Sequence, residues 1–382
     1  MKKIIAFLLA ALMILSMVAC AAQTEAPAQT EAEEQTQTTA PEQTENEDTQ
    51  TTEETETTEK KGYVIGFTNS FNGNTFRQQE ETYFKELAEQ MKADGIISEY
   101  YMACSNNDNA VQVSQIQNFI MMGVDAIIVD PGSATALNGA IDEAVDAGIP
   151  VLVFNDGPVT TSSCYQLNVD CVYNFGYLAE WACKKLDYKG DVLIIRGLPG
   201  NSYDELAYTG MIDVINSYED VNVVGEVYGE WTSTVAQSEV AAILPSLSNV
   251  DMVIGQGGDA YGAAMAFTAA GLDVPLITAG NRGDFLNWWM DEYEKNGYET
   301  ISGMSSPWFA AASLYMMIDI LDGVEVPQYM YYPMETITVD NLFDYEGISD
   351  TAVAAEEHDW DWVRETLETQ DSAANKPEMV TD

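Results

Sequence analysis

From residue 62 onward, short apolar runs alternate with longer stretches whose apolar positions recur every three or four residues. The short runs predict buried strands at 63–68, 126–129, 151–154, 192–195, 221–227, 252–254 and 274–278. The longer stretches predict helices at 75–93, 110–121, 134–147, 173–186, 203–217, 234–247, 261–270, 284–295 and 309–321. Because this alternation is typical of parallel sheets covered by helices, the expected fold class is α/β.

Two parts of the chain resemble each other. GVDAIIVD at 123–130 precedes AGIPVLVFN at 147–155, and NVDMVIGQ at 249–256 precedes AGLDVPLITAGN at 270–281. Each pair has the order of a helix end, a turn and a buried strand. The repeat therefore predicts two lobes of one design, each wound in the same sense, rather than one large sheet. A cleft between two such lobes is a natural ligand site.

The stretch YVIGFTNSFNGNTFRQQ at 63–79 begins as a strand, passes through a polar turn and ends as a helix. Ligands of open α/β sheets bind beyond the carboxyl ends of the strands. The turn therefore places five side chains where a ligand would lie: Ser70, Phe71, Asn74, Phe76 and Arg77. The alternative is that Phe76 belongs to the core and Arg77 is a solvated helix residue.

The first 20 residues have the pattern of a secretory signal. Two lysines precede an apolar stretch at 4–18, which ends in the small-residue sequence VAC at 18–20. This end resembles the lipobox of bacterial lipoproteins, although Met17 replaces the commoner leucine. The resemblance implies that Cys20 is diacylated and becomes the mature N-terminus. We favour it over the alternative, an ordinary signal peptide with a chance cysteine.

Residues 21–61 consist almost entirely of Thr, Glu, Gln, Ala and Pro, without aromatic residues. Such a segment buries too little apolar surface to offset chain entropy, so it is expected to be a disordered, acidic tether. The formal net charge of the chain is −47, which opposes a nucleic-acid partner because a phosphate backbone needs a basic surface. Beyond the N-terminus, no run is long and apolar enough to span a membrane.

The sequence argues against a metal or nucleotide cofactor. Five cysteines and the single histidine, His358, are a poor basis for a zinc site. GQGGDAYG at 255–262 does not have GxGxxG spacing, and GLPGNS at 197–202 lacks the lysine of a P-loop. Both glycine-rich runs therefore indicate tight turns, and no cofactor is expected.

Cysteines and tryptophans leave alternatives open. Export permits disulfides, so Cys164 and Cys171 could pair; with Cys104 and Cys183, three connectivities or free thiols are open. Three tryptophans could lie in the core or at the rim of a cleft: Trp288, Trp289 and Trp308.

The order and spacing of several pieces resemble the type I periplasmic-binding-protein family, specifically the sugar-binding proteins of ABC transporters, over residues 62–341. The pieces, none diagnostic alone, are IGFTNSFNGNTFRQ, GVDAIIVDP, AGIPVLVFND, LNVDCVYNFGYLA, GLPGNSYDELAYTG, GEWTSTVAQ, MVIGQGGDAYGAAMAF and TISGMSSPWFAAA. The resemblance implies two Rossmann-like lobes hinged around a central cleft, with chain crossings near 168–170, 303–304 and Glu335.

The resemblance also implies domain boundaries. After the signal peptide (1–20) and tether (21–61), the N-terminal lobe is expected at 62–168 plus 304–334, the C-terminal lobe at 169–303 plus 335–366, and a flexible tail at 367–382.

Ligand-binding positions follow from the same resemblance. Ser70, Asn74 and Phe76 match polar and aromatic positions of the family's first loop, and Trp231 and Gln256 match positions of its second lobe. An aromatic face stacks on the C–H side of a sugar, and an arginine fork donates hydrogen bonds to its oxygens.

Two arginines of the family pattern are missing. Asn155-Asp156 stands where the family carries an Asp-Arg pair, and Glu205 stands where it carries a later arginine. Arg77 and Arg282 are therefore the remaining candidate cations. The expected ligand-binding residues are Ser70, Phe71, Asn74, Phe76, Arg77, Asp130, Asn155, Asp156, Glu205, Trp231, Gln256, Asn281 and Arg282.

The expected function is that of a monomeric receptor on the outer side of the cell membrane, anchored by lipid at Cys20. It captures a small sugar and delivers it to an ABC transporter permease. The alternatives are a sugar sensor for a membrane receptor or kinase, and a binder of an amino sugar or other cationic polar solute. An enzyme is not expected, because the only histidine lies in the acidic tail and no barrel-like repeat is visible.

Overall fold

A computed structural model describes residues 62–155 and 158–375 of the chain. Several expectations concern residues outside the described part. They are those for the signal peptide with Cys20, the tether, Asp156, the side chain of Asn155 and residues 376–382.

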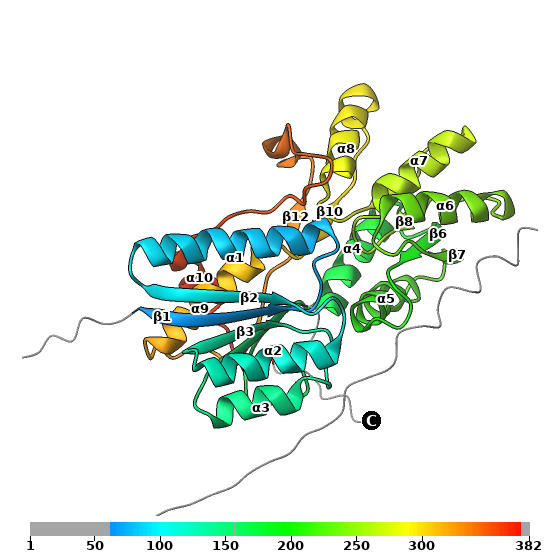
Figure 1. Cartoon of the computed structure of the whole chain (residues 1–382). Helices are drawn as coiled ribbons and strands as arrows, with labels where there is room; N and C mark the ends of the chain where they lie inside the picture. The colour runs from blue at the N-terminus through cyan, green and yellow to red at the C-terminus, as the bar shows by residue number, and fades with distance from the viewer. Residues whose placement is uncertain (1–61, 156–157, 376–382) are drawn as a thin grey trace, which may run out of the picture. The chain divides into compact units, whose positions relative to one another are not determined.

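The first sheet has six parallel strands in the order β11-β5-β4-β3-β1-β2. Its strands are β1 (Tyr63–Asn69), β2 (Ile97–Cys104), β3 (Ala126–Asp130), β4 (Val151–Asn155), β5 (Tyr165–Asn168) and β11 (Tyr329–Tyr331). Helices α1 (Thr75–Ala93) and α9 (Phe309–Leu321) cover one face, and α2 (Asn109–Met122) and α3 (Asn138–Asp146) cover the other (Figure 1). The central strands are thus buried on both faces, which explains their uninterrupted apolar runs.

The second sheet has four parallel strands in the order β7-β6-β8-β9. Its strands are β6 (Gly190–Arg196), β7 (Val221–Tyr228), β8 (Met252–Ile254) and β9 (Leu276–Thr278). Its helices are α4 (Cys171–Lys185), α5 (Ser202–Ile215), α6 (Ser233–Ile243) with the 3-10 turn η1 (Leu244–Ser246), α7 (Ala260–Ala270) and α8 (Gly283–Asn296). Two separate parallel sheets confirm the predicted α/β fold with two lobes.

Several strands escaped prediction because they lie at edges or crossings. Strand β2 pairs with β1 alone, and most of its residues are partly or well exposed, so it has no continuous apolar run. Strands β10 (Ser302–Met304) and β12 (Glu335–Ile337) form a short antiparallel pair outside both large sheets. Their three residues each are too few to show a period.

Within the described residues the chain passes between the two sheets four times, once more than expected. Three passages match the expectation: between β5 and α4, between β10 and α9, and between β11 and β12. The fourth leads from the 3-10 turn η2 (Leu342–Tyr345), which packs near α8, to α10 (Trp360–Thr366).

Helix α10 packs on α9 of the first lobe, whereas the sequence analysis assigned residues 335–366 to the C-terminal lobe. The Arg364 guanidinium bonds both oxygens of Asp319 at 2.6 and 2.8 Å, and the Trp360 indole donates to Asp319 at 2.7 Å. Asp319 is 1% exposed. A buried carboxylate on α9 needs such donors, and this need holds α10 against the first lobe.

Residues 367–375 are not a free tail, contrary to expectation. The Gln370 side chain accepts from Tyr331 N at 2.9 Å and donates to Tyr331 O at 2.8 Å, and Ser372 Oγ accepts from Tyr329 N at 3.1 Å. These contacts satisfy the open edge of strand β11, which would otherwise expose unpaired backbone groups.

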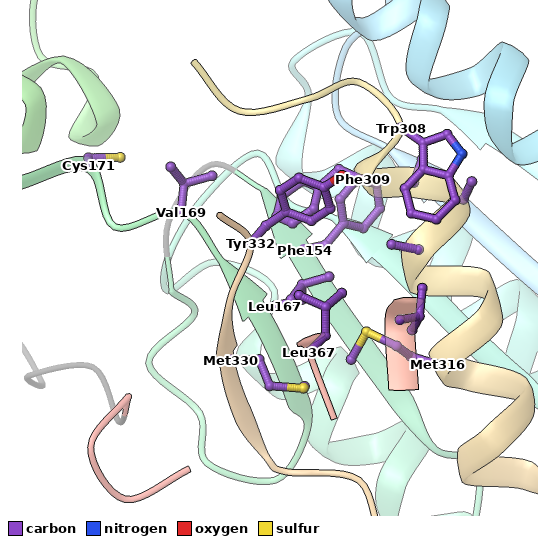
Figure 2. Close-up of a cluster of buried hydrophobic side chains, with 14 of the residues drawn as sticks. Phe154, Leu167, Val169, Cys171, Trp308, Phe309, Met316, Met330, Tyr332 and Leu367 are labelled. Atoms are coloured by element: carbon purple, nitrogen blue, oxygen red, sulfur yellow. The ribbon is translucent and has the colours of Figure 1, made fainter. Parts of the chain in front are cut away.

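A large apolar cluster lies between the first sheet and α9 (Figure 2). Phe154 on β4 meets Phe309 on α9 edge to face at 5.4 Å, and Tyr332 also meets Phe309 edge to face, at 4.7 Å. Trp308 is buried in this cluster, and Trp289 is fully buried in the second lobe, where its indole donates to Tyr298 O at 3.0 Å. Both tryptophans therefore belong to cores.

The described cysteines do not form the disulfide that the sequence left open. Cys104, Cys164 and Cys183 are free thiols, so Cys164 is not bonded to Cys171. Burial raises the pKa of the Cys164 thiol to about 12 and that of Cys183 to about 11, which makes both unreactive at neutral pH.

Candidate functional site

The turn after β1 is organised by its own polar side chains. Asn74 caps helix α1 by accepting a hydrogen bond from Arg77 N at 2.9 Å, which satisfies an amide at the helix start. Ser70 is buried, and its N–H donates to Asp130 O at 3.0 Å, joining the carboxyl ends of β1 and β3. The Phe71 ring lies against Gly73, where a Cβ would come within 2.2 Å of it. Phe76 is half-buried on α1.

Arg77 lies in a buried charge cluster rather than in solvent. Its guanidinium forms an ion pair with Asp130 at the end of β3 and a second contact with Glu80 at 3.5 Å. Arg77 is 6% exposed, and both carboxylates are fully buried. A buried carboxylate is tolerated only with charged or hydrogen-bonding partners, so this guanidinium holds the first lobe's strand ends together.

A second charge cluster, which the sequence analysis missed, lies at the end of β6. Arg196 Nη2 contacts Asp204 Oδ2 at 2.6 Å and Glu205 Oε1 at 2.7 Å. Its guanidinium lies over the ring of Tyr208 and over that of Tyr228, at 4.2 and 5.2 Å from their centroids. Arg196 is thus a third cation beside the two expected. The sequence feature that could have revealed Arg196 is its place at the last position of an apolar strand, directly before a glycine-rich turn.

Trp231 and Gln256 join the turns of the second lobe. The Trp231 indole lies over Gly197, where a Cβ would come within 2.2 Å of the ring, and donates to Gln256 Oε1 at 3.3 Å. Gln256 Oε1 also accepts from Gly197 N at 3.0 Å, and its Nε2 donates to Asp204 O at 3.1 Å. The buried Gln256 amide therefore positions the half-buried Trp231 ring and the start of α5.

Asn281 and Arg282 lie at the crossings. Asn281 is buried; its amide donates to Glu335 O at 2.9 Å and accepts from Ser302 Oγ at 2.6 Å, which ties the turn after β9 to β10 and β12. Arg282 Nε contacts Asp284 Oδ2 at 3.1 Å. These bonds give Asn281 a supporting role in the geometry of the crossings.

Contacts through Val353 bring the two lobes' turns near each other. Gln79, two residues after Arg77, accepts from Val353 N at 2.7 Å and donates to Val353 O at 3.1 Å. Val353 in turn forms an antiparallel bridge with Arg282. The first turns of α1 are therefore connected through one residue to the second lobe.

A cavity of about 250 Å³ lies between the segment that joins β11 to β12 and the segment that joins η2 to α10. Its lining includes Tyr332, Glu335, Glu356, His358 and Trp362. Both oxygens of Glu335 accept from Glu356 N at 3.2 Å. Burial raises the pKa of Glu335 to about 7, and burial lowers the pKa of His358, whose ring stacks on Trp362 at 3.7 Å.

Replacing Glu335 by glutamine is expected to stabilise the protein at pH 8 by about 1–3 kcal/mol and to have little effect at pH 5. The folded-state pKa of about 7 exceeds the ordinary 4.5. The native state therefore keeps a proton that the unfolded chain releases, and stability falls as the pH rises through this window. Urea unfolding at both pH values tests this, with Glu239→Gln on the surface of α6 as control. Equal pH slopes for Glu335→Gln and the unaltered protein would contradict it. Burial also raises the pKa of Asp259 to about 6 and that of Glu368 to about 7. The free energy of unfolding of Glu335→Gln should therefore still fall somewhat as the pH rises.

Two lobes with polar and aromatic clusters at their strand ends, joined by several passages, define a hinged α/β binding protein. Residues 65–325 match the profile of the family described as periplasmic binding protein domain, and the chain belongs to that family. It is a type I periplasmic binding protein.

Relatives agree with this assignment. The chain is 32% identical to an ABC transporter solute binding protein from Thermobispora bispora, whose crystal structure superposes with a TM-score of 0.72 over 84% of this chain and 98% of that one. It is 29% identical over 286 residues to a protein of Rhizobium meliloti named for rhizopine binding, covering 72% of this chain and 88% of the relative. A xylitol-binding protein of Mycolicibacterium smegmatis is 27% identical over 241 residues, 62% of this chain and 68% of the relative.

Proposed function

We propose that this protein is an extracytoplasmic lipoprotein that captures a small sugar between its lobes and delivers it to an ABC transporter permease. The observation that carries the proposal is the pair of strand-end clusters, Arg77 with Asp130 on one lobe and Trp231 with Gln256 on the other. The name of the Thermobispora relative, an ABC transporter solute binding protein, supports the transport context, and the xylitol-binding name of the Mycolicibacterium relative supports a polyhydroxylated ligand.

The mechanism follows from the passages between the lobes. A ligand that contacts both clusters favours the closed arrangement, whereas a ligand that binds one lobe equally in both arrangements shifts nothing. Closure is then a rotation about the four passages. The half-buried Trp231 ring offers a flat face for stacking on the ligand's C–H side, and the Ser70 hydroxyl offers a hydrogen-bonding group to its hydroxyls.

A thermal-shift screen of the purified protein against neutral mono- and disaccharides and polyols tests the proposal. A ligand that binds only the native state raises the melting temperature by mass action, by an amount that grows with its concentration. A saturable rise with at least one sugar or polyol, followed by calorimetric titration, is the expected result. The absence of any shift across the screen would overturn the proposal.

The lipid anchor is proposed from the sequence at Cys20. Cys20→Ser removes the acylation site and is expected to release the protein from membranes. After the signal peptide has been cleaved, a protein without the lipid chain lacks the proposed anchor in the bilayer. No helix among the described residues is long and apolar enough to cross a membrane. Fractionation after a high-salt wash is the measurement, with Cys104→Ser as the matched control that should stay membrane-bound. A Cys20→Ser protein that remains in the membrane pellet would rule out the lipoprotein assignment.

A further inference from the structure

Each arginine at the described strand ends already faces carboxylates. Two carboxylates, Asp130 and Glu80, share the Arg77 guanidinium in the first lobe. The Arg196 guanidinium of the second lobe is likewise shared by Asp204 and Glu205. In the second cluster two carboxylates contact one guanidinium, so this group of three side chains carries an excess negative charge when ionised.

The third arginine does not reverse this balance. Arg282 is paired with Asp284, whose carboxylate also accepts from Ser233 Oγ at 2.8 Å. An anionic ligand, such as a sugar phosphate or a sugar acid, would have to displace one of these carboxylates from its arginine. Where the displaced carboxylate is Asp130, Glu80 or Asp204, each of which is fully buried, the exchange leaves it without its partner, which is costly.

The carboxylates of the second lobe differ in access. Asp204 is fully buried, and its oxygens accept from Arg196 at 2.6 and 3.3 Å and from Gly197 N at 2.8 Å. Glu205 has a side chain that is 57% exposed, and its described contact is one bond to Arg196. Glu205 is therefore the carboxylate of this cluster that can also accept a hydrogen bond from a ligand.

Aromatic rings at the start of α5 suit a cation as well. The Tyr203 ring, two residues before Glu205, meets the Trp231 indole edge to face at 5.9 Å. The faces of aromatic rings attract ammonium groups, most strongly in tryptophan. A ligand ammonium that reaches this end of α5 would gain from this attraction.

We propose, building on the sugar-binding function above, that the site rejects anionic sugars and prefers a sugar or polyol carrying a protonated amine, with Glu205 as the specificity-determining residue. The ammonium donates to Glu205, while the hydroxyls use the remaining polar groups of both lobes. Charge-assisted hydrogen bonds of this kind are stronger than those between neutral groups.

Calorimetric titration with matched triplets tests the preference. The probes are glucose, glucosamine and glucuronate, the corresponding galactose triplet, and the amino and acidic derivatives of any neutral sugar or polyol found in the screen. At about pH 6.5 the amine is protonated, and the amino compound is expected to bind about ten- to a hundredfold more tightly than its neutral counterpart. The acid is expected not to bind. A neutral or acidic member that binds as tightly as the amino one would overturn this inference and leave sugar binding intact. No binding by any member would overturn the proposed function itself.

Glu205→Gln isolates the residue. Because Arg196 keeps Asp204, the variant should melt at the temperature of the unaltered protein, while the affinity ratio of amino to neutral ligand falls about tenfold. Glu239→Gln, an exposed carboxylate on α6, is the matched control and should leave the ratio unchanged. Glu205→Asp, which keeps the charge, should retain most of the preference for the amino ligand. It provides a second test if the glutamine variant folds poorly. An unchanged ratio in Glu205→Gln would overturn the assignment of Glu205.

Discussion

Replacing Arg77 by methionine is expected to lower the free energy of unfolding by about 3–5 kcal/mol, because it removes the guanidinium from two buried carboxylates. Asp130 and Glu80 are both fully buried, and both contact Arg77. Methionine retains much of the side chain's length and apolar volume, so the loss reports on charge rather than on a cavity. Urea unfolding at neutral pH is the measurement.

Two further variants separate this effect from general damage to α1. Lys85→Met removes an exposed cation from the same helix and should change stability by less than about 0.5 kcal/mol. Adding Asp130→Asn to Arg77→Met should recover part of the lost stability, because the variant then buries one carboxylate fewer. If Arg77→Met were as stable as Lys85→Met, the charge cluster would have no role in holding the first lobe's strand ends.

Trp231→Ala is expected to weaken ligand binding by about 1–3 kcal/mol, the range of an aromatic binding hot spot. The ring is half-buried over Gly197 and is held by the Gln256 amide at 3.3 Å, so its removal takes away a prepared stacking surface. Stability should change less than binding, because part of the ring is already in contact with water. Titration with a ligand from the screen and a melt of the same variant give the two quantities.

Trp289→Ala is the matched control on the same lobe. Its indole is fully buried and hydrogen-bonded to Tyr298 O, so its truncation should cost about 3–5 kcal/mol of folding stability. Native binding with a large drop in melting temperature for Trp231→Ala would instead assign Trp231 to the core and remove it from the site.

Much of the fold was predictable because central parallel strands are buried on both faces. Along β3, Ile128 faces the α1 side while Ile127 and Val129 face the α2 side, so no polar residue interrupts the run. Strand β2 was missed because an edge strand needs no such run, and α10 was assigned to the wrong lobe. Its position depends on Asp319, a buried carboxylate 45 residues before Arg364.

Within the candidate site, the sequence places Arg77 and Trp231 close after predicted strands, but it does not reveal which residues they contact. The contact of Arg77 with Asp130 requires β3 to lie next to β1 in the sheet. Arg196 was not predicted as a site residue because a charged residue at the end of an apolar strand is usually exposed to solvent. Only the neighbouring α5 shows that it faces Asp204 and Glu205.

By itself, the sequence determined two α/β lobes, their strand-to-helix turns and the polar and aromatic residues in those turns, because periodicity and turn chemistry are local properties of the chain. Tertiary structure alone decided which carboxylates pair with which arginines, that a fourth passage joins the lobes, and that residues 367–375 complete the edge of β11. Electrostatic and hydrogen-bond energies depend on distances between residues far apart in sequence, and those distances exist only once the sheets have formed.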